Sequence, residues 1–191
     1  MAGWETFPAD TRRLNILLPT SLYPDMLKTK YVLPVLAAFA LSSAGAVLPP
    51  GSNLAPYEIK NTASNETYCQ MCAFSSKPAT VAAYGKLGDE AFWTDLEKLQ
   101  TLQKDNPSVG FYAQVLDSTD TKAIQAEAKK HGITFPVVYA VDKDWEDTYK
   151  VGGVSRTVYL SKNFKVGWSN VGLDDKSLAA VKAKLATDAK S

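Results

Sequence analysis

Apolar residues recur along residues 57–188 with two different spacings, which predict alternating strands and helices. Short stretches in which apolar residues alternate with polar ones, or follow one another without interruption, indicate strands. Stretches in which apolar residues recur every three or four positions indicate helices. The expected strands are 57–60, 79–84, 108–116, 135–141, 154–160 and 165–168. The expected helices are 89–104 and 119–132, a helical turn at 143–149, and a last helix that begins at Asp174 or Asp175.

The order of these elements predicts an α/β fold. Two strand–helix units follow one another at 79–104 and 108–132, and such units join parallel strands of one sheet through crossover helices. The remainder changes to a hairpin at 154–168 and a final helix. We therefore expect a sheet that contains both parallel and antiparallel strands.

The first 46 residues predict a targeting segment. Two lysines precede an apolar run at 31–41, and Ala44-Gly45-Ala46 matches the small-residue cleavage site of a secretory signal peptide. The run is shorter than the roughly 20 residues that span a bilayer, so an uncleaved anchor is the less favoured alternative. We expect a signal peptide at 26–46, preceded by a start-site extension at 1–25. The mature chain is expected to be secreted or periplasmic, without stable membrane insertion after cleavage.

Charge is balanced in the rest of the chain. The sequence has 21 Lys or Arg and 20 Asp or Glu, of which four and three lie in residues 1–46. Residues 47–191 therefore carry no excess of positive charge, which argues against nucleic acid and anionic membrane surfaces as partners. Pro49-Pro50-Gly51-Ser52-Asn53 has the composition of a linker. We expect a linker at 47–56 and a single domain at 57–191.

Cys69 and Cys72 are the only cysteines, and their spacing is that of a redox disulfide. In such a pair, one thiolate attacks a disulfide while the second stays close enough to resolve the mixed intermediate. A structural disulfide is the alternative, because closing so small a ring stabilises by about 2 kcal/mol in the loop-closure model. A c-type haem site needs His where Ala73 follows Cys72, and a closed zinc site needs four ligands. His131 is the only histidine, so we expect no cofactor and no metal.

The element order resembles that of the thioredoxin-like fold, and two phrases resemble its TlpA-like and peroxiredoxin-like branch. These phrases are Phe135-Pro136-Val137 and Tyr149-Lys150-Val151-Gly152, which precede the hairpin. The resemblance covers about residues 57–188. It implies a three-layer sandwich around a central mixed sheet, in which a C-x-x-C pair opens the helix after the first central strand. The N-terminal dipole of that helix stabilises the thiolate in the family.

The chain departs from this pattern at both parts of the usual active site. The position after the first central strand is Gly85-Lys86-Leu87-Gly88-Asp89-Glu90, which has no cysteine. The family's cis-proline aligns near Val154-Ser155-Arg156-Thr157, which has no proline. Cys69, Cys72 and Pro78 instead resemble a set of exported bacterial proteins that carry the pair ahead of the first strand. Any helix between the pair and that strand has at most one or two turns, so its dipole is weak.

Two functions follow from the cysteine pair, and the sequence leaves both open. In the first, the chain is a thiol–disulfide oxidoreductase that acts on protein thiols or disulfides, with Cys69 as the attacking thiol and Cys72 as the resolving one. In the second, it is a non-enzymatic interaction or scaffold domain in which the Cys69–Cys72 bond is structural. The oligomeric state is open as well.

Other polar residues favour ordinary surface roles. His131 lies at the expected end of a helix beside two lysines, where the dipole favours a cation, so a solvated helix end is favoured over a catalytic base. Arg156 is expected to face solvent from a strand. The acidic residues near the start of the first long helix show no spacing that would bring metal ligands together, and they are Asp89, Glu90, Asp95 and Glu97.

Overall fold

The computed structural model describes residues 47–142 and 144–188. The signal peptide and the start-site extension expected at 1–46 lie outside these residues. The described strands are β1 (Glu58–Asn61), β2 (Thr67–Cys69), β3 (Thr80–Gly85), β4 (Gly110–Val115), β5 (Val137–Ala140), β6 (Arg156–Lys162) and β7 (Lys165–Asn170). The described helices are α1 (Gln70–Phe74), α2 (Glu90–Asp105), α3 (Thr121–Lys130), α4 (Glu146–Tyr149) and α5 (Asp175–Asp188).

The strands form one mixed sheet of seven, in the order β2-β1-β5-β4-β3-β6-β7. Strands β3, β4 and β5 are parallel, as the two strand–helix units predict. The hairpin of β6 and β7 adds to one side, with β6 antiparallel to β3. Strands β1 and β2 add to the other side, with β1 antiparallel to β5. The expected mixed sheet is confirmed.

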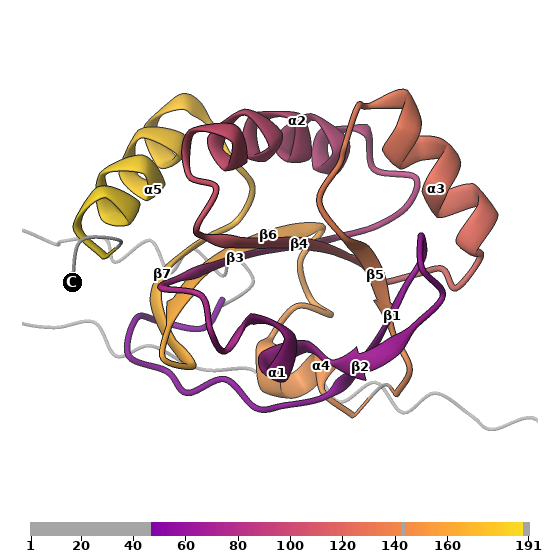
Figure 1. The fold of residues 1–191 in the computed structure, drawn as a ribbon, viewed down its shortest axis with the longest axis horizontal. Helices are drawn as coiled ribbons and strands as arrows, with labels where there is room; N and C mark the ends of the chain where they lie inside the picture. Colours follow the sequence, from indigo (N-terminus) through magenta and orange to yellow (C-terminus); the bar gives the residue numbers. More distant parts are fainter. Residues whose placement is uncertain (1–46, 143, 189–191) are drawn as a thin grey trace, which may run out of the picture. The chain divides into compact units, whose positions relative to one another are not determined.

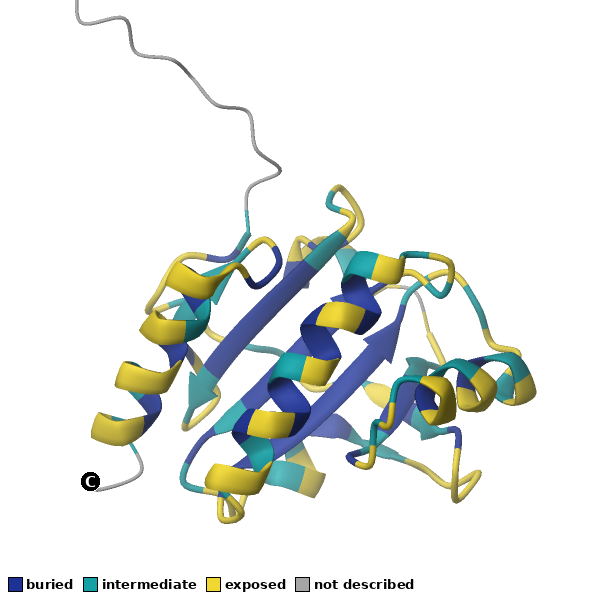
Figure 2. Ribbon diagram, turned by 90° about the horizontal axis from the view of Figure 1, so that it is seen from above, coloured by how far each residue is buried: buried dark blue, intermediate teal, exposed yellow. Residues whose placement is uncertain are grey.

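Helices cover both faces of the sheet, which gives three layers (Figure 1). The long helices α2, α3 and α5 lie on one face, which we call the helix face. The short helices α1 and α4 lie on the other, which we call the tyrosine face because most of its buried aromatic side chains are tyrosines. Each long helix turns a buried stripe toward the sheet and an exposed stripe outward, and the central strands are buried (Figure 2). This is the pattern that the helical spacing predicts.

Local signals explain where the main helix begins. The Asp89 side chain accepts a hydrogen bond from the Ala91 N–H at 3.0 Å, which caps the N-terminus of α2. The next turns of α2 direct Phe92, Leu96 and Leu99 into the core, where all three are buried. The expected cap and apolar stripe are therefore confirmed.

Two segments differ from expectation. Thr67–Cys69, for which the sequence predicts no strand, forms β2, because Asn65 adopts a positive φ of 61° and turns the chain back onto β1. Residues 47–56, expected to be a linker, pack against the domain. Gly51 N–H donates to the Val166 carbonyl at 2.7 Å, and Leu48 is 7% exposed. Hydrogen bonding along β7 and burial of Leu48 outweigh the flexibility that the Pro/Gly composition suggests.

Candidate functional site

The cysteine pair lies where an edge strand becomes a short helix. Cys69 is the last residue of β2 and the N-cap of α1. Its sulfur accepts a hydrogen bond from the Cys72 N–H, with 3.3 Å between N and Sγ. Helix α1 has five residues, so the expectation of one or two turns is confirmed, and its dipole gives the sulfur little help beyond this one N–H.

The two cysteines are bonded to each other in a turn at the surface of the domain. The Cα atoms of Cys69 and Cys72 are 5.3 Å apart, within the usual range for a disulfide. Cys72 is exposed and Cys69 is half-buried. The disulfide therefore lies in a partly exposed turn and not in the core of the domain.

Helix α1 is anchored by the residue that directly follows Cys69. Gln70 is 4% exposed, and its amide donates to the Tyr149 hydroxyl at 2.8 Å and to the Ala55 carbonyl at 3.2 Å. At the other end of the helix, the Phe74 ring stacks on Tyr112 with 5.1 Å between centroids. The disulfide is thus carried by a turn whose two ends are fixed to the domain. No local pattern predicts the role of Gln70, because its partners are 15 and 79 residues away in the chain.

A cluster of tyrosines lies beneath this turn. The Tyr57 hydroxyl donates to Gln114 Oε1 at 2.7 Å, and the hydroxyls of Tyr84 and Tyr112 are 2.7 Å apart. Burial is the main cause that raises the pKa of Tyr112 to about 12 and the pKa values of Tyr57 and Tyr84 well above their usual value. These phenols stay protonated at neutral pH, so they can donate hydrogen bonds but bring no charge to the disulfide.

A small hollow of about 100 Å³ opens beside α1. Met71 and Phe74 line it from the helix, and Phe164 lines it from the β6–β7 turn. Lys77 and Lys162 stand among the other lining residues. The hollow therefore combines apolar and basic side chains, and it lies beside the helix that carries Cys72.

The pair is displaced sideways across the sheet from the usual position of this fold. Cys69 pairs with Glu58, and the next residue, Ile59, pairs with Ala140 at the end of β5. By this register Cys69 lies toward the edge where the parallel strands have their C-termini. Strands β1, β5 and β4 separate it from β3, after which the family places its cysteines.

The usual position itself is closed by packing. The end of β3 meets α2 so tightly that a Cβ on Gly85 would lie 2.3 Å from the Phe92 ring. The loop that follows is tied by the Leu87 N–H, which donates to Asp117 at 2.8 Å. Residues 85–90 contain no cysteine, so the hollow that Lys86, Asp117 and their neighbours line there offers no thiol.

Arg156 and Asp95 form an ion pair at this position. Asp95 lies in the early turns of α2, where the sequence predicts acidic residues. Arg156 is expected to face solvent from a strand, and the structure corrects this expectation. Instead Arg156 Nε lies 2.8 Å from Asp95 Oδ2, and the Asp95 side chain is 5% exposed. The Leu173 N–H donates to the same oxygen at 3.0 Å. Burial raises the pKa of Asp95, and its contacts with Arg156 and Leu173 partly offset this.

The expectation for His131 is also corrected. It does follow the last turn of α3, but its side chain is 6% exposed and its ring stacks on Trp93 with 5.6 Å between centroids. The preceding lysines made a solvated helix end the simpler interpretation, and the packing of α3 against α2 overrides it.

Among the described residues, no helix is long and apolar enough to cross a membrane.

Comparison with known proteins gives a clear result for the fold. No family model matches the chain, and no curated protein matches it either. Many solved structures do. One, described as a thiol:disulfide interchange protein DsbE from Chlorobium tepidum, is 13% identical with a TM-score of 0.64, over 74% of this chain and 99% of the other.

Two further matches have the same character. The thioredoxin domain of a thiol-disulfide oxidoreductase from Bacteroides vulgatus is 12% identical with a TM-score of 0.62, over 72% of this chain and 98% of the other. A secreted disulfide oxidoreductase from Mycobacterium tuberculosis is 12% identical with a TM-score of 0.55, over 68% and 96%. At such identities the likeness concerns the fold and not the activity. Together with the sheet order and the crossover helices, it shows that this chain has the thioredoxin-like fold.

Proposed function

We propose that this chain is an exported thiol–disulfide oxidoreductase that works through Cys69 and Cys72. The observation that carries the proposal is a partly exposed disulfide at a strand–helix junction, in which the second cysteine's N–H donates to the first cysteine's sulfur. The same hydrogen bond stabilises a thiolate on Cys69 once the bond is reduced. The fold supports the proposal, since the named oxidoreductases above share it.

The reaction needs no cofactor. In the reducing direction, the Cys69 thiolate attacks one sulfur of a substrate disulfide, which forms a mixed disulfide and releases one substrate thiolate. Cys72 loses its proton and attacks Cys69, which restores the internal bond and releases the second substrate thiolate. Two electrons pass from the dithiol to the substrate, and the released thiolates take up protons from water. The oxidising direction is the reverse of these steps.

Protein thiols or disulfides are the proposed substrates. The hollow beside α1 is small, and its apolar and basic side chains suit an extended peptide segment more than an enclosed small molecule. The signal peptide predicted at 26–46 supports an oxidising compartment as the location of the reaction, where a resting disulfide persists.

The roles of the two cysteines are tested by trapping. With insulin as substrate, wild-type protein should catalyse reduction, while Cys69→Ala and Cys72→Ala should both fall to the uncatalysed rate. Cys72→Ala should accumulate a mixed disulfide with a protein substrate, and Cys69→Ala should accumulate much less. Cys72 is the more exposed of the two and is therefore the alternative attacking thiol. The opposite trapping pattern would assign the attacking role to Cys72 and the resolving role to Cys69. Wild-type turnover no faster than that of the variants would refute the enzymatic role.

A structural disulfide is the second candidate, and the short helix favours it. A five-residue helix activates a thiolate weakly, and the bond fastens α1 to β2. The reduction potential separates the two functions. Equilibration with glutathione at about −120 to −270 mV, the range of known oxidoreductases, supports the enzyme, whereas a potential below about −300 mV supports an inert fastening.

A further inference from the structure

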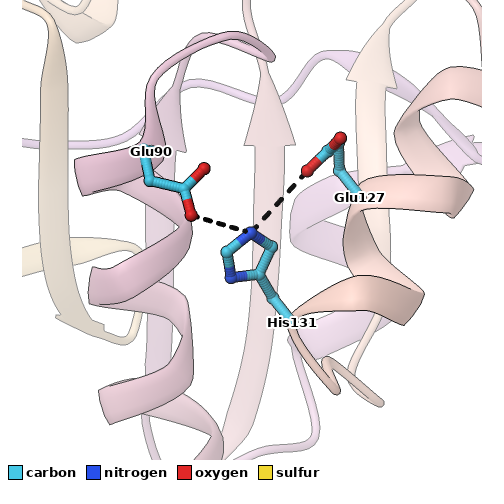
Figure 3. Close-up of side chains that lie close together, drawn as sticks. All are labelled: Glu90, Glu127 and His131. Carbon is cyan, nitrogen blue, oxygen red and sulfur yellow. Dashed lines mark ion pairs between the residues drawn. The ribbon is translucent and has the colours of Figure 1, made fainter.

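Three side chains from two helices converge on the helix face, away from the disulfide. Glu90 begins α2, Glu127 lies in α3, and His131 follows the last turn of α3 (Figure 3). One ligand atom from each lies within 4.8 Å of the other two. Exposed acidic groups are often close together without binding a metal ion, so a metal site here depends on the histidine.

One ring nitrogen of His131 makes a hydrogen bond, and the other lies near two carboxylates without one. Its Nδ1 lies 2.8 Å from Glu97 Oε1, and its ring stacks on Trp93 at an interplanar angle of 18°. A carboxylate can only accept, so Nδ1 carries the proton of this hydrogen bond. The other nitrogen, Nε2, is buried and has no hydrogen-bond partner. In the neutral ring its lone pair therefore points into the space between the two remaining carboxylates (Figure 3).

The distances suit a small divalent cation. Nε2 lies 3.5 Å from Glu90 Oε1 and 3.7 Å from Glu127 Oε2. Zinc bonds of about 2.0–2.1 Å in a tetrahedron separate neighbouring ligand atoms by about 3.4 Å. Small rotations of the two glutamates, whose side chains are 69% and 35% exposed, would close the set onto one ion.

We propose that Glu90, Glu127 and His131 form a binding site for a divalent transition-metal ion, with Zn²⁺ as the preferred ion. One imidazole and two carboxylates match the ligand types of zinc sites with three protein ligands, which leave a fourth position for water. Glu97 is a positioning residue, because its hydrogen bond to Nδ1 fixes the ring and its tautomer as carboxylates do in known histidine–metal sites.

Lys130 competes for this position. Its Nζ lies 3.0 Å from Glu127 Oε2 and 3.4 Å from Glu90 Oε2, so its ammonium group neutralises the carboxylates that the ion would use. The Lys130 side chain is 56% exposed and can swing into solvent. Its removal should therefore strengthen metal binding, whereas loss of an ordinary surface lysine would not.

Titration of the oxidised, chelator-treated protein with Zn²⁺ tests the site by calorimetry, and Co²⁺ absorption reports the geometry. In the oxidised protein the disulfide sulfurs are not thiolate ligands. We expect one ion per chain and a tetrahedral Co²⁺ spectrum. Glu90→Gln, Glu127→Gln and His131→Gln should each weaken binding by at least about tenfold, and Glu97→Gln by about 10–100-fold. Lys130→Gln should strengthen it.

The controls separate this site from its alternatives. Glu66→Gln changes an exposed carboxylate on the β1–β2 turn and should leave binding unchanged. The Cys69→Ala, Cys72→Ala double variant should bind as the wild type does, which keeps the metal site independent of the redox proposal. His131 is buried, so its variant could unfold, but the two glutamates are on the surface and keep the test decisive. No stoichiometric binding, or binding that survives both Glu90→Gln and Glu127→Gln, would overturn the proposal.

Discussion

The two faces of the sheet are packed by different means. On the helix face, α2, α3 and α5 cover a core of aliphatic, phenylalanine and tryptophan side chains, and its buried members in the described residues include no tyrosine. On the tyrosine face, the helices α1 and α4 have five and four residues. Tyr149 of α4 is buried there together with Tyr84, Tyr112 and Tyr159 of the sheet. Long helices bring enough apolar surface to cover a sheet, whereas one-turn helices leave a space that large side chains must fill.

The two faces also differ in where the cysteines lie. In the thioredoxin pattern the pair opens the long helix of the helix face, and here that helix begins with Asp89 as a cap and Glu90 in its first turn. The pair lies instead on the short helix of the tyrosine face, held by the buried amide of Gln70. At the usual position of the pair, the ion pair of Arg156 and Asp95 joins β6 to α2.

The largest expected effect comes from breaking that ion pair. Arg156→Ala leaves the Asp95 carboxylate buried without its partner, which should lower the free energy of unfolding by about 3–5 kcal/mol. Urea unfolding measures the loss. Lys165→Ala, which removes an exposed cation from the neighbouring strand, should change stability by less than about 0.5 kcal/mol. The reduction potential of Cys69–Cys72 should stay at its wild-type value in both variants. A large shift in Arg156→Ala would mean that the usual position still governs the redox site.

The helix face was the more predictable of the two. Its helices and strands carry long apolar periods and a capping aspartate, which are local signals that the sequence displays directly. The ion pair of Arg156 with Asp95 escaped prediction because the partners are 61 residues apart and only the fold brings them together. His131 escaped for a related reason, since packing of α3 on α2 buries a ring whose neighbours in sequence are charged.

The tyrosine face was the harder part. The cysteine spacing identified the candidate site. Strand β2, however, depends on the positive φ of Asn65, which the surrounding polar residues do not predict. A five-residue helix has too few positions for a periodic pattern. The sequence therefore predicts an upper limit for the length of α1 but not its first and last residues. The packing of residues 47–56 came from contacts with β6 and β7, which a Pro/Gly composition hides.

The second prediction uses pH to address the tyrosine face alone. The pKa of Tyr112 is raised to about 12 by burial, against an ordinary value of about 10. Below about pH 10 the phenol is protonated in both states and has no effect on the pH dependence. Between about pH 10 and 12 it ionises only in the unfolded chain, so stability is lost as pH rises. At about 1.4 kcal/mol per pH unit, Tyr112 contributes a loss of about 3 kcal/mol.

Urea unfolding at a series of alkaline pH values measures this loss. Tyr112→Phe should show a smaller decline between about pH 10 and 12. The remainder is due to the other tyrosines whose pKa values are raised by burial, which are Tyr57, Tyr68, Tyr84, Tyr149 and Tyr159. Tyr139→Phe, on a residue packed against the helix face, should keep the full decline because Tyr112 is still present. Equal declines in the two variants would contradict the assignment to the tyrosine face.

The third prediction tests how the redox turn is anchored. Gln70→Ala removes the amide that joins α1 to Tyr149 and Ala55, which should cost about 1–3 kcal/mol because buried groups lose their partner. The amides of α1 should exchange hydrogen faster, and the disulfide should be reduced more quickly as the turn opens. Met71→Ala alters the next, half-exposed residue and serves as the matched control. Similar exchange rates in the two variants would remove Gln70 from this role.

The smallest expected effect concerns the charge beside the attacking sulfur. Glu58 pairs with Cys69 across the β1–β2 ladder, and directly opposed side chains have their Cβ atoms about 4.5–5.5 Å apart. Its carboxylate disfavours a thiolate on Cys69, because like charges repel and the short helix offers little compensation. Glu58→Gln should therefore lower the pKa of the reduced Cys69 thiol and increase the rate of insulin reduction at neutral pH about two- to threefold.

Charge can be distinguished from packing in this last experiment by salt and by a second variant. High salt screens exposed charges, so the rates of wild type and Glu58→Gln should converge as ionic strength rises. Glu66→Gln removes an exposed carboxylate from the β1–β2 turn, at the other end of the ladder from Cys69, and should leave the rate unchanged. If Glu58→Gln accelerated the reaction equally at low and high salt, the effect would come from altered contacts of β2, and Glu58 would not set the electrostatics of the displaced site.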